Sequence, residues 1–243
     1  MRIGHAGFVA TVLVLAVGIG MILPVFFSDA RNSARLEVAL IFEVGNPSDK
    51  LWCQGVSNTL TREGIRATVF FSGEFAYTHP ECVQCFSEGV DIGSQTLSYS
   101  NLTSITDYTV QLGEVVDGKA KVDEAGELDS KLFRAPYGST DENIYSLLSR
   151  AGILADFSYT DHYNIFYEGQ FIRIDASIYE LSQTHAYDLV TSAKELGVQR
   201  ILVIIDETSL SEEYTQLIQT LRSEGYNFIN VTDLAEFEVT TRR

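Results

Sequence analysis

Short apolar runs alternate with segments of helical periodicity along this chain, and this alternation most constrains its fold. The apolar runs are rich in Val, Ile and Phe and predict strands at 37–42, 67–71, 91–93, 132–134, 153–155, 171–174, 201–205 and 227–229. The segments between them predict helices at 48–63, 80–88, 104–124, 141–151, 179–196 and 211–224. Repeated βα units of this kind favour a mainly parallel α/β sheet or barrel.

The chain is long enough for one domain with a sizeable core. It has 243 residues, of which 45% are hydrophobic, and 14 are Phe and 12 are Tyr. A disordered acidic chain is poor in such residues, so a packed globular domain is predicted over 36–243.

The formal net charge of -16 bears on the partners of the domain. Proteins that bind nucleic acid neutralise phosphates with Lys and Arg. A strongly acidic chain repels the same phosphates, so no nucleic acid partner is expected.

The first 35 residues carry an apolar segment. Residues 8–27 contain no charged side chain, and about 20 such residues form a helix that spans the hydrocarbon core of a bilayer. The secretory h-region is only about 7–15 residues long. We therefore predict a short tail at 1–7, a transmembrane helix or signal anchor at 8–27 and a polar tether at 28–35.

Three cysteines occur in the chain, Cys53, Cys82 and Cys85. A structural zinc site needs four ligands, and no second cysteine or histidine pair follows at suitable spacing. Two alternatives stay open, namely a disulfide from Cys53 to one of the pair, or three buried hydrophobic thiols.

Four segments carry a resemblance to a known family. They read LFRAPYG at 132–138, IRATVFFSG at 65–73, EGVDIGSQ at 88–95 and GYNFIN at 225–230. With these segments, the chain resembles the NodB-like polysaccharide deacetylases of carbohydrate esterase family four from about residue 36 to 236. The resemblance implies a distorted (β/α)7-type barrel, and sites in such barrels lie at the C-terminal ends of the strands.

The resemblance also implies where a divalent metal such as zinc is held, and these positions have changed. The family's first strand ends in Thr-Phe-Asp-Asp-Gly, whereas IFEVG stands here at 41–45. Glu43 keeps a carboxylate at the position of the catalytic base, but Val44 replaces a metal ligand. Gln95 and Tyr99 replace the two histidine ligands of the family. An isopropyl group, an amide and a phenol are poor ligands for such an ion, so no metal cofactor is expected.

Other family positions are partly kept. Arg134, which pairs with the base in the family, is present, whereas Ile205 stands at the position of the general acid histidine. Glu43 and Arg134 are therefore expected to form a vestigial catalytic pair, either in a glycan cleft or as an ion pair that closes the barrel mouth. The expected substrate-binding residues are Tyr137, through its backbone N–H, and Tyr99, Asp161 and His162.

Aromatic residues gather in the segments expected at this mouth. They are Tyr99, Tyr159, His162, Tyr163, Phe166 and Tyr167. Aromatic faces are natural platforms for sugar rings, but aromatic residues in long loops also pack as small hydrophobic clusters. Both interpretations stay open.

The leading hypothesis is a membrane-anchored deacetylase-like protein that is catalytically inactive and binds a cell-envelope glycan or partner. A single-pass protein of the cell membrane with an extracellular domain is expected, and no oligomeric state is predicted. The alternative is an active hydrolase of carbon–nitrogen bonds other than peptide bonds. It deacetylates N-acetylated sugars with Glu43 as base or with a metal relocated to Glu43, Asp161, Asp206 and His162. A third hypothesis is a structural envelope protein whose mouth is filled by Val44, Tyr99 and Ile205.

Overall fold

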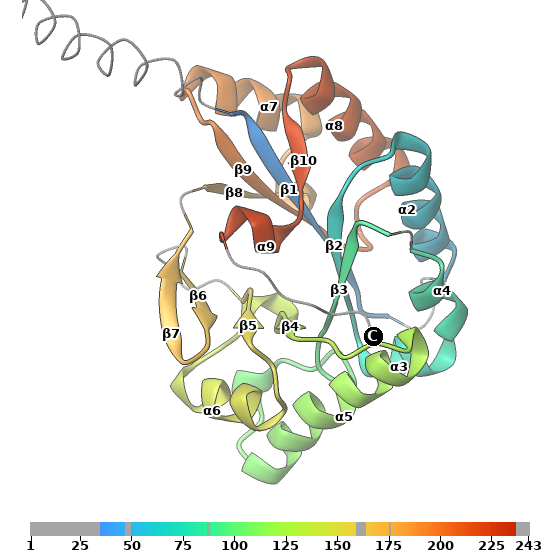
Figure 1. Cartoon of the computed structure of the whole chain (residues 1–243), viewed down its shortest axis with the longest axis vertical. Helices are drawn as coiled ribbons and strands as arrows, with labels where there is room; N and C mark the ends of the chain where they lie inside the picture. The colour runs from blue at the N-terminus through green and yellow to red at the C-terminus, as the bar shows by residue number, and fades with distance from the viewer. Residues whose placement is uncertain (1–34, 47–49, 87, 159–163, 175, 237–243) are drawn as a thin grey trace, which may run out of the picture. The chain divides into compact units, whose positions relative to one another are not determined.

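One ten-stranded sheet organises the domain in a computed structural model of the chain (Figure 1). The structure describes residues 35–46, 50–86, 88–158, 164–174 and 176–236. The strand order is β7-β6-β5-β4-β3-β2-β1-β9-β8, and β10 pairs with β1 beside this path. The strands are β1 (Glu37–Val44), β2 (Ala67–Phe71), β3 (Val90–Ser94), β4 (Leu132–Phe133), β5 (Ala155–Asp156), β6 (Asn164–Tyr167), β7 (Gln170–Arg173), β8 (Ser177–Glu180), β9 (Arg200–Ile205) and β10 (Asn227–Ile229).

Strand β1 lies at the centre of the sheet. It pairs in parallel with β9 from Glu37 to Phe42, with β2 from Ile41 to Val44 and with β10 from Glu37 to Ala39. A strand with neighbours on both sides and layers on both faces is apolar throughout. This requirement explains why seven of its eight residues are buried.

The two faces of β1 enter different hydrophobic layers. Val38, Leu40, Phe42 and Val44 belong to the cluster formed with the outer helices. Ala39 and Ile41 belong to a second cluster with residues of β2, β4 and β9. Because successive side chains of a strand point to opposite faces, Glu43 is expected on the inner side with Ala39 and Ile41.

In Figure 1, helices lie above, to the right of and below the sheet, β6 and β7 lie at its left, and the short α9 lies near the centre of the view. The helices are α2 (Lys50–Glu63), α3 (Gly73–Thr78), α4 (Pro80–Gln84), α5 (Tyr108–Gly126), α6 (Glu142–Arg150), α7 (Ala186–Glu195), α8 (Ser211–Ser223) and α9 (Val231–Leu234), with the 3₁₀ helices η2 (Leu102–Ser104), η3 (Pro136–Gly138) and η4 (Leu181–Gln183). Local sequence determines where α5 and α6 begin, because the Asp107 and Asp141 side chains accept hydrogen bonds from the first free N–H groups of these helices.

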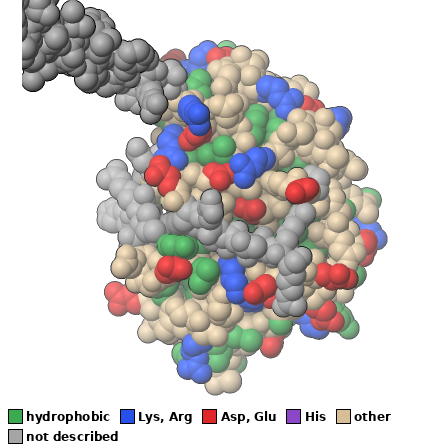
Figure 2. All heavy atoms as spheres, in the orientation of Figure 1, with side chains coloured by type: hydrophobic (Ala, Val, Ile, Leu, Met, Phe, Trp, Pro, Cys, Tyr) green, Lys and Arg blue, Asp and Glu red, His purple; other side chains and the backbone are tan. Residues whose placement is uncertain are grey.

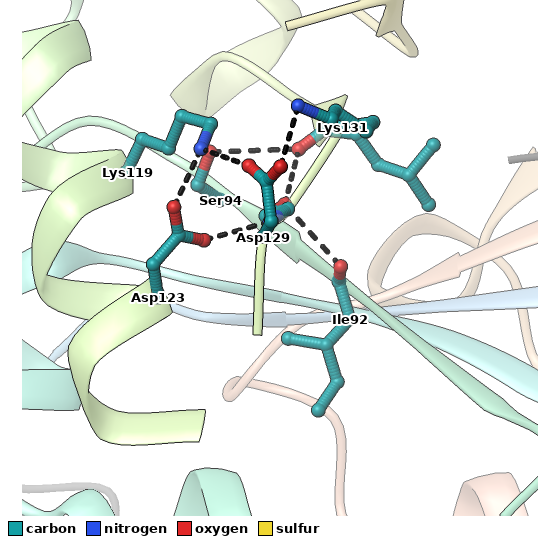
Figure 3. A network of polar contacts seen from close by, with 8 residues as sticks. Ile92, Ser94, Lys119, Asp123, Asp129 and Lys131 are labelled. Atoms are coloured by element: carbon teal, nitrogen blue, oxygen red, sulfur yellow. Dashed lines mark hydrogen bonds and ion pairs between the residues drawn. The ribbon is translucent and has the colours of Figure 1, made fainter. Parts of the chain in front are cut away.

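A polar network fixes the end of α5 to the segment that leads into β4 (Figure 3). Lys119 Nζ lies 2.5 Å from Asp123 Oδ2 and 2.9 Å from Asp129 Oδ1. Lys131 Nζ lies 2.7 Å from the other oxygen of Asp129, and Ser130 N donates to Asp123 Oδ1 at 2.7 Å. The Lys119 side chain is only 10% exposed, so these contacts are more strongly held than ordinary surface pairs. The network thereby fixes the position of the strand that precedes Arg134.

Most predicted elements are confirmed, but one predicted helix begins later than expected and one predicted strand pairs differently. The helix expected over 179–196 begins only at Ala186, because Ser177–Glu180 forms β8 and pairs in parallel with β9. The strand expected over 171–174 is β7, which pairs antiparallel with β6 in a hairpin rather than as a βα unit. Both differences fall where the structure of a short segment depends on the strand beside it.

The α/β class is confirmed, whereas the closure of the barrel differs from the expectation. Among the described residues, strand pairing ends at β7 on one side and at β8 on the other. The sheet is therefore a half-barrel rather than a fully paired (β/α)7 barrel. Its inner space is filled by the cluster that includes Phe70, Phe157, Val231 and Leu234.

The N-terminal predictions fall outside this unit. The tail, the apolar segment 8–27 and nearly all of the tether lie outside the described residues. Within the described part of the chain, no helix combines the length and apolar character needed to cross a bilayer.

On the face shown in Figure 2, the acidic and basic side chains of the described residues are interspersed.

Candidate functional site

A cavity of about 520 Å³ opens at the C-terminal ends of the parallel strands. It is lined by residues at the ends of β1, β8 and β9 and by those that follow β3 and β4, among them Glu43, Tyr99, Arg134, Tyr137, Glu180 and Asp206. This is the edge at which barrels of this kind carry their sites. Of the six predicted site residues, the structure brings four to this cavity, Glu43, Arg134, Tyr99 and Tyr137. Asp161 and His162 lie outside the described residues.

Glu43 and Arg134 form a buried ion pair in the cavity wall. Arg134 Nε lies 2.7 Å from Glu43 Oε1, and the two residues are 3% and 5% exposed. Arg134 Nη1 also donates to the carbonyl oxygen of Phe157 at 2.7 Å. Burial raises the pKa of Glu43, Arg134 opposes this effect, and the nearby carboxylates of Asp206 and Glu180 raise the pKa further.

Gln95 lies next to this pair at the end of β3 and is fully buried. Its Nε2 donates to Glu43 Oε1 at 3.2 Å, while its Oε1 has no hydrogen-bond partner among the described residues. The amide thus presents its NH2 donor to the carboxylate, and this nitrogen is a poor metal ligand because its lone pair is delocalised into the carbonyl.

Tyr99 covers the end of β1. Its ring carbons lie 2.3–2.6 Å from where a Cβ on Gly45 would stand, so only glycine fits beneath the ring. Tyr99 has a φ of 59°, and its ring centroid lies 5.5 Å from that of Tyr137, which is 69% exposed with a φ of 62°. Burial, together with the charge of Glu43, raises the pKa of the Tyr99 hydroxyl, so the phenol is neutral at physiological pH.

Val44 and Ile205 do not fill the mouth of the cavity. Both side chains are fully buried in the cluster under the outer helices. Ile204, not Ile205, lines the cavity, because alternate residues of a strand face opposite sides. The expectation that Val44, Tyr99 and Ile205 together obstruct the mouth is therefore wrong for the two aliphatic residues.

These residues do not fit the divalent metal that the resemblance implies. Val44 points into the core, Gln95 donates to Glu43, and Tyr99 carries a neutral phenol. In the described segments, no three His, Cys, Asp or Glu side chains are grouped so that they could hold a metal ion. The residues that the structure describes here thus offer no ligand set for a metal-dependent step.

Two acidic residues were not predicted as site residues from the sequence, one that lines the cavity and one that is buried outside its lining. Glu180 was assigned to the first turn of a helix, whereas it ends β8 and lines the cavity. Asp156, at the end of β5, is 1% exposed, and burial raises its pKa to about 7 although the N–H and hydroxyl of Ser158 donate to its Oδ1. An acidic residue directly after an apolar run was the signal available in the sequence for both positions.

The aromatic residues expected at the mouth differ in their surroundings: one lines the cavity, where it could contact a sugar ring, and two pack against hydrophobic residues. Tyr99 lines the cavity, whereas Phe166 stacks on Tyr145 at 4.3 Å and Tyr167 packs against the inner hydrophobic cluster. The remaining three, Tyr159, His162 and Tyr163, lie outside the described residues.

The cysteines lie together on the opposite side of β1 from the cavity. Cys53 and Cys82 are buried in the cluster under the outer helices, whereas Cys85 is exposed. The interpretation of three buried thiols is therefore wrong for Cys85. A hydrogen bond with Cys53 lowers the pKa of Cys85 to about 6, in spite of partial burial.

Solved structures of deacetylases share this fold. The peptidoglycan deacetylase PdaC from Bacillus subtilis superposes with a TM-score of 0.60 at 19% identity, covering 83% of this chain and 91% of that one. A carbohydrate esterase of family 4 from Streptomyces lividans gives a TM-score of 0.57 at 19% identity, covering 81% of this chain and 92% of that one.

A structure described as that of a pseudoenzyme also shares the fold. BA3943 from Bacillus anthracis, a pseudoenzyme of family CE4, gives a TM-score of 0.62 at 14% identity, covering 85% of this chain and 68% of that one. At these identities the structures establish the fold. The model of the polysaccharide deacetylase family matches residues 30–155, slightly more than half of the chain. On its sequence and its half-barrel, this chain belongs to the polysaccharide deacetylase family.

Proposed function

We propose that this chain binds a cell-envelope glycan in the cavity of about 520 Å³ without hydrolysing it through a bound metal. The observation that carries the proposal is the replacement of the ligand set around an otherwise intact pocket. Glu43, Arg134 and Tyr137 line the pocket, while Val44, Gln95 and Tyr99 stand where the resemblance places metal ligands.

The loss of these ligands removes the chemistry that drives amide hydrolysis at neutral pH. A bound metal lowers the pKa of water from about 15.7 to about 7 and so generates the nucleophile. Loss of the general acid lowers the rate of hydrolysis by a further factor of roughly 10² to 10⁴. Glu43 is a poor general base in its place, because its carboxylate already accepts from Arg134 and Gln95.

The same pocket keeps the features that bind a sugar. Its volume is within the range of about 300–1,000 Å³ typical of ligand pockets. Tyr137 presents a ring that is 69% exposed beside Tyr99, and carboxylates and hydroxyls also line the pocket. Aromatic faces pack on the apolar faces of sugar rings while polar groups fix their hydroxyls.

A relative offers a precedent for such a protein. BA3943 is described as a pseudoenzyme of this family, and a mutant of it is described as having restored enzymatic activity. The fold of the family thus occurs in a protein without the activity.

We also propose that residues 8–27 anchor the chain in the cell membrane with the domain outside. The support is the length and apolar character of this segment. Recovery of the full chain in the membrane fraction after a carbonate wash, with the domain digested by protease added to intact cells, is the expected result. Release into the supernatant would exclude an anchor.

The function is tested with the full chain in a mild non-ionic detergent and with oligomers of glucosamine in N-acetylated and free-amine form. We expect calorimetric binding of at least one oligomer, and no release of acetate with or without added zinc. The variant Tyr137→Asn removes the exposed ring but tolerates the left-handed backbone, so binding should weaken at least tenfold. The matched control is Tyr187→Asn, because Tyr187 is 66% exposed on α7.

Two results would contradict the proposal. Absence of binding to every oligomer would leave a structural role only. Acetate release that Glu43→Gln abolishes would instead establish the alternative of an active hydrolase, with Glu43 as its base.

A further inference from the structure

Carboxylates dominate the charge of the cavity. Glu43, Glu180, Asp206 and Glu207 line it, and among the described residues Arg134 is the only Lys or Arg side chain that does so. The charge of Arg134 is matched by Glu43 at 2.7 Å. Glu180 and Asp206 form no ion pair with a Lys or Arg of the described part of the chain. The cavity therefore has an excess of negative charge.

This charge acts on the groups inside the cavity. The carboxylates of Asp206 and Glu180 raise the pKa of Glu43, and those of Glu43, Glu207 and Asp206 raise the pKa of Tyr99. Each effect means that a further negative charge is disfavoured at these positions, and that a positive charge is favoured.

The acidic surface continues beyond the cavity. A second cavity of about 430 Å³ shares Ser182, Gln183 and Thr208 with the first, and Glu213 lines it. Because the two cavities share these three lining residues, they lie next to each other, and we refer to them together as the groove. Four of its five carboxylates line the first cavity.

We propose that this groove selects amino sugars with a free, protonated amine, that is, de-N-acetylated glycan, over their N-acetylated counterparts. The inference rests on the proposed glycan binding and names its ligand class. Hydrolysis of an N-acetyl amide leaves a primary amine, and an amine beside electron-withdrawing groups is cationic below about pH 8. An acetylated nitrogen carries no charge, so only the free amine gains from the carboxylates.

The test compares the glucosamine tetramer with the N-acetylglucosamine tetramer on the full chain, by calorimetry at pH 7 and low salt. We expect the free-amine tetramer to bind at least tenfold more tightly. The preference should disappear at pH 9.5, where the amine is neutral, and should fall with added salt.

Variants distinguish attraction of the amine by the carboxylates of the groove from attraction by the net charge of the chain, which is -16. Asp206→Asn and Glu180→Gln keep the oxygens that accept from Thr208 and Gln183, so the fold should persist and thermal midpoints should match the wild type. Each should weaken binding of the free-amine tetramer at least fivefold. The control Glu195→Gln removes the same charge from an exposed position on α7 and should leave binding unchanged.

The outcomes distinguish this inference from the proposed function. If the acetylated tetramer binds equally or more tightly, the inference is wrong while glycan binding stands. Equal losses in Asp206→Asn and Glu195→Gln would also overturn it, since the attraction would then be non-specific. If neither tetramer binds, the proposed function fails as well.

Discussion

Arg134 Nε lies 2.7 Å from Oε1 of Glu43 and so joins the segment after β4 to the end of β1 across the inner face of the sheet. Both side chains are almost fully buried. A buried pair contributes little relative to apolar residues of the same size, but removal of one partner leaves an uncompensated charge.

We therefore expect Arg134→Met to lower the free energy of unfolding by about 3–5 kcal/mol. The double variant Glu43→Leu with Arg134→Met should lose much less than the sum of the single losses. Urea unfolding of the three variants measures this coupling. The control is Arg62→Met, whose exposed pair with Glu63 should change stability by less than about 1 kcal/mol. Additive single losses would contradict the coupling.

Gly45→Ala tests the packing of Tyr99. A Cβ at Gly45 would stand 2.3 Å from the Tyr99 ring, and such overpacking costs typically about 1–3 kcal/mol. Gly45→Ala should thus lower the thermal midpoint, and Tyr99→Ala in the same chain should restore most of the loss. As a control, Gly113→Ala lies within α5 with its nearest atom at 3.8 Å, and it should stabilise the domain by up to about 1 kcal/mol. A Gly45→Ala variant as stable as wild type would contradict the packing.

The raised pKa of Asp156 predicts that the free energy of unfolding depends on pH in a specific way. Its pKa is about 7 in the folded protein against 3.8 in the unfolded chain. A raised pKa stabilises the fold below pH 4, and this contribution is lost between pH 4 and 7 as the unfolded chain alone gives up its proton. Relative to wild type, Asp156→Asn should gain up to about 4 kcal/mol across this window. Urea unfolding at pH 4, 5.5 and 7 measures the difference in free energy of unfolding between Asp156→Asn and the wild type. A difference that is the same at all three pH values would show that Asp156 has an ordinary pKa.

Cys85 is predicted to react as a thiolate at unusually low pH. Its pKa is lowered to about 6 by the hydrogen bond with Cys53, and it is exposed. The rate of alkylation by iodoacetamide should therefore rise with a midpoint near pH 6 and level off above pH 7, as read by peptide mass spectrometry. Cys53→Ala should move the midpoint toward the ordinary value of about 8.5. A wild-type midpoint above pH 8 would contradict the contact.

Long elements could be predicted from the sequence, because their signals are local. The runs at β1, β2 and β9 are apolar and were placed within two residues of their observed ends. Short strands could not be predicted in the same way. The segment 177–180 becomes β8 only because β9 offers it a free edge, and without that neighbour its residues fit a helix equally well.

The sequence by itself determined the family, the α/β class and the side-chain chemistry at Val44, Gln95 and Tyr99, where the resemblance places metal ligands, because this chemistry does not depend on the fold. Only the tertiary structure decided where these and neighbouring side chains lie. Val44 and Ile205 are buried in the outer core, and the Tyr99 ring packs over Gly45. Glu180 and Asp206, at the ends of different strands, line the same cavity. The physical reason is that strand alternation and pairing, which bring together residues far apart in sequence, set the direction of each side chain.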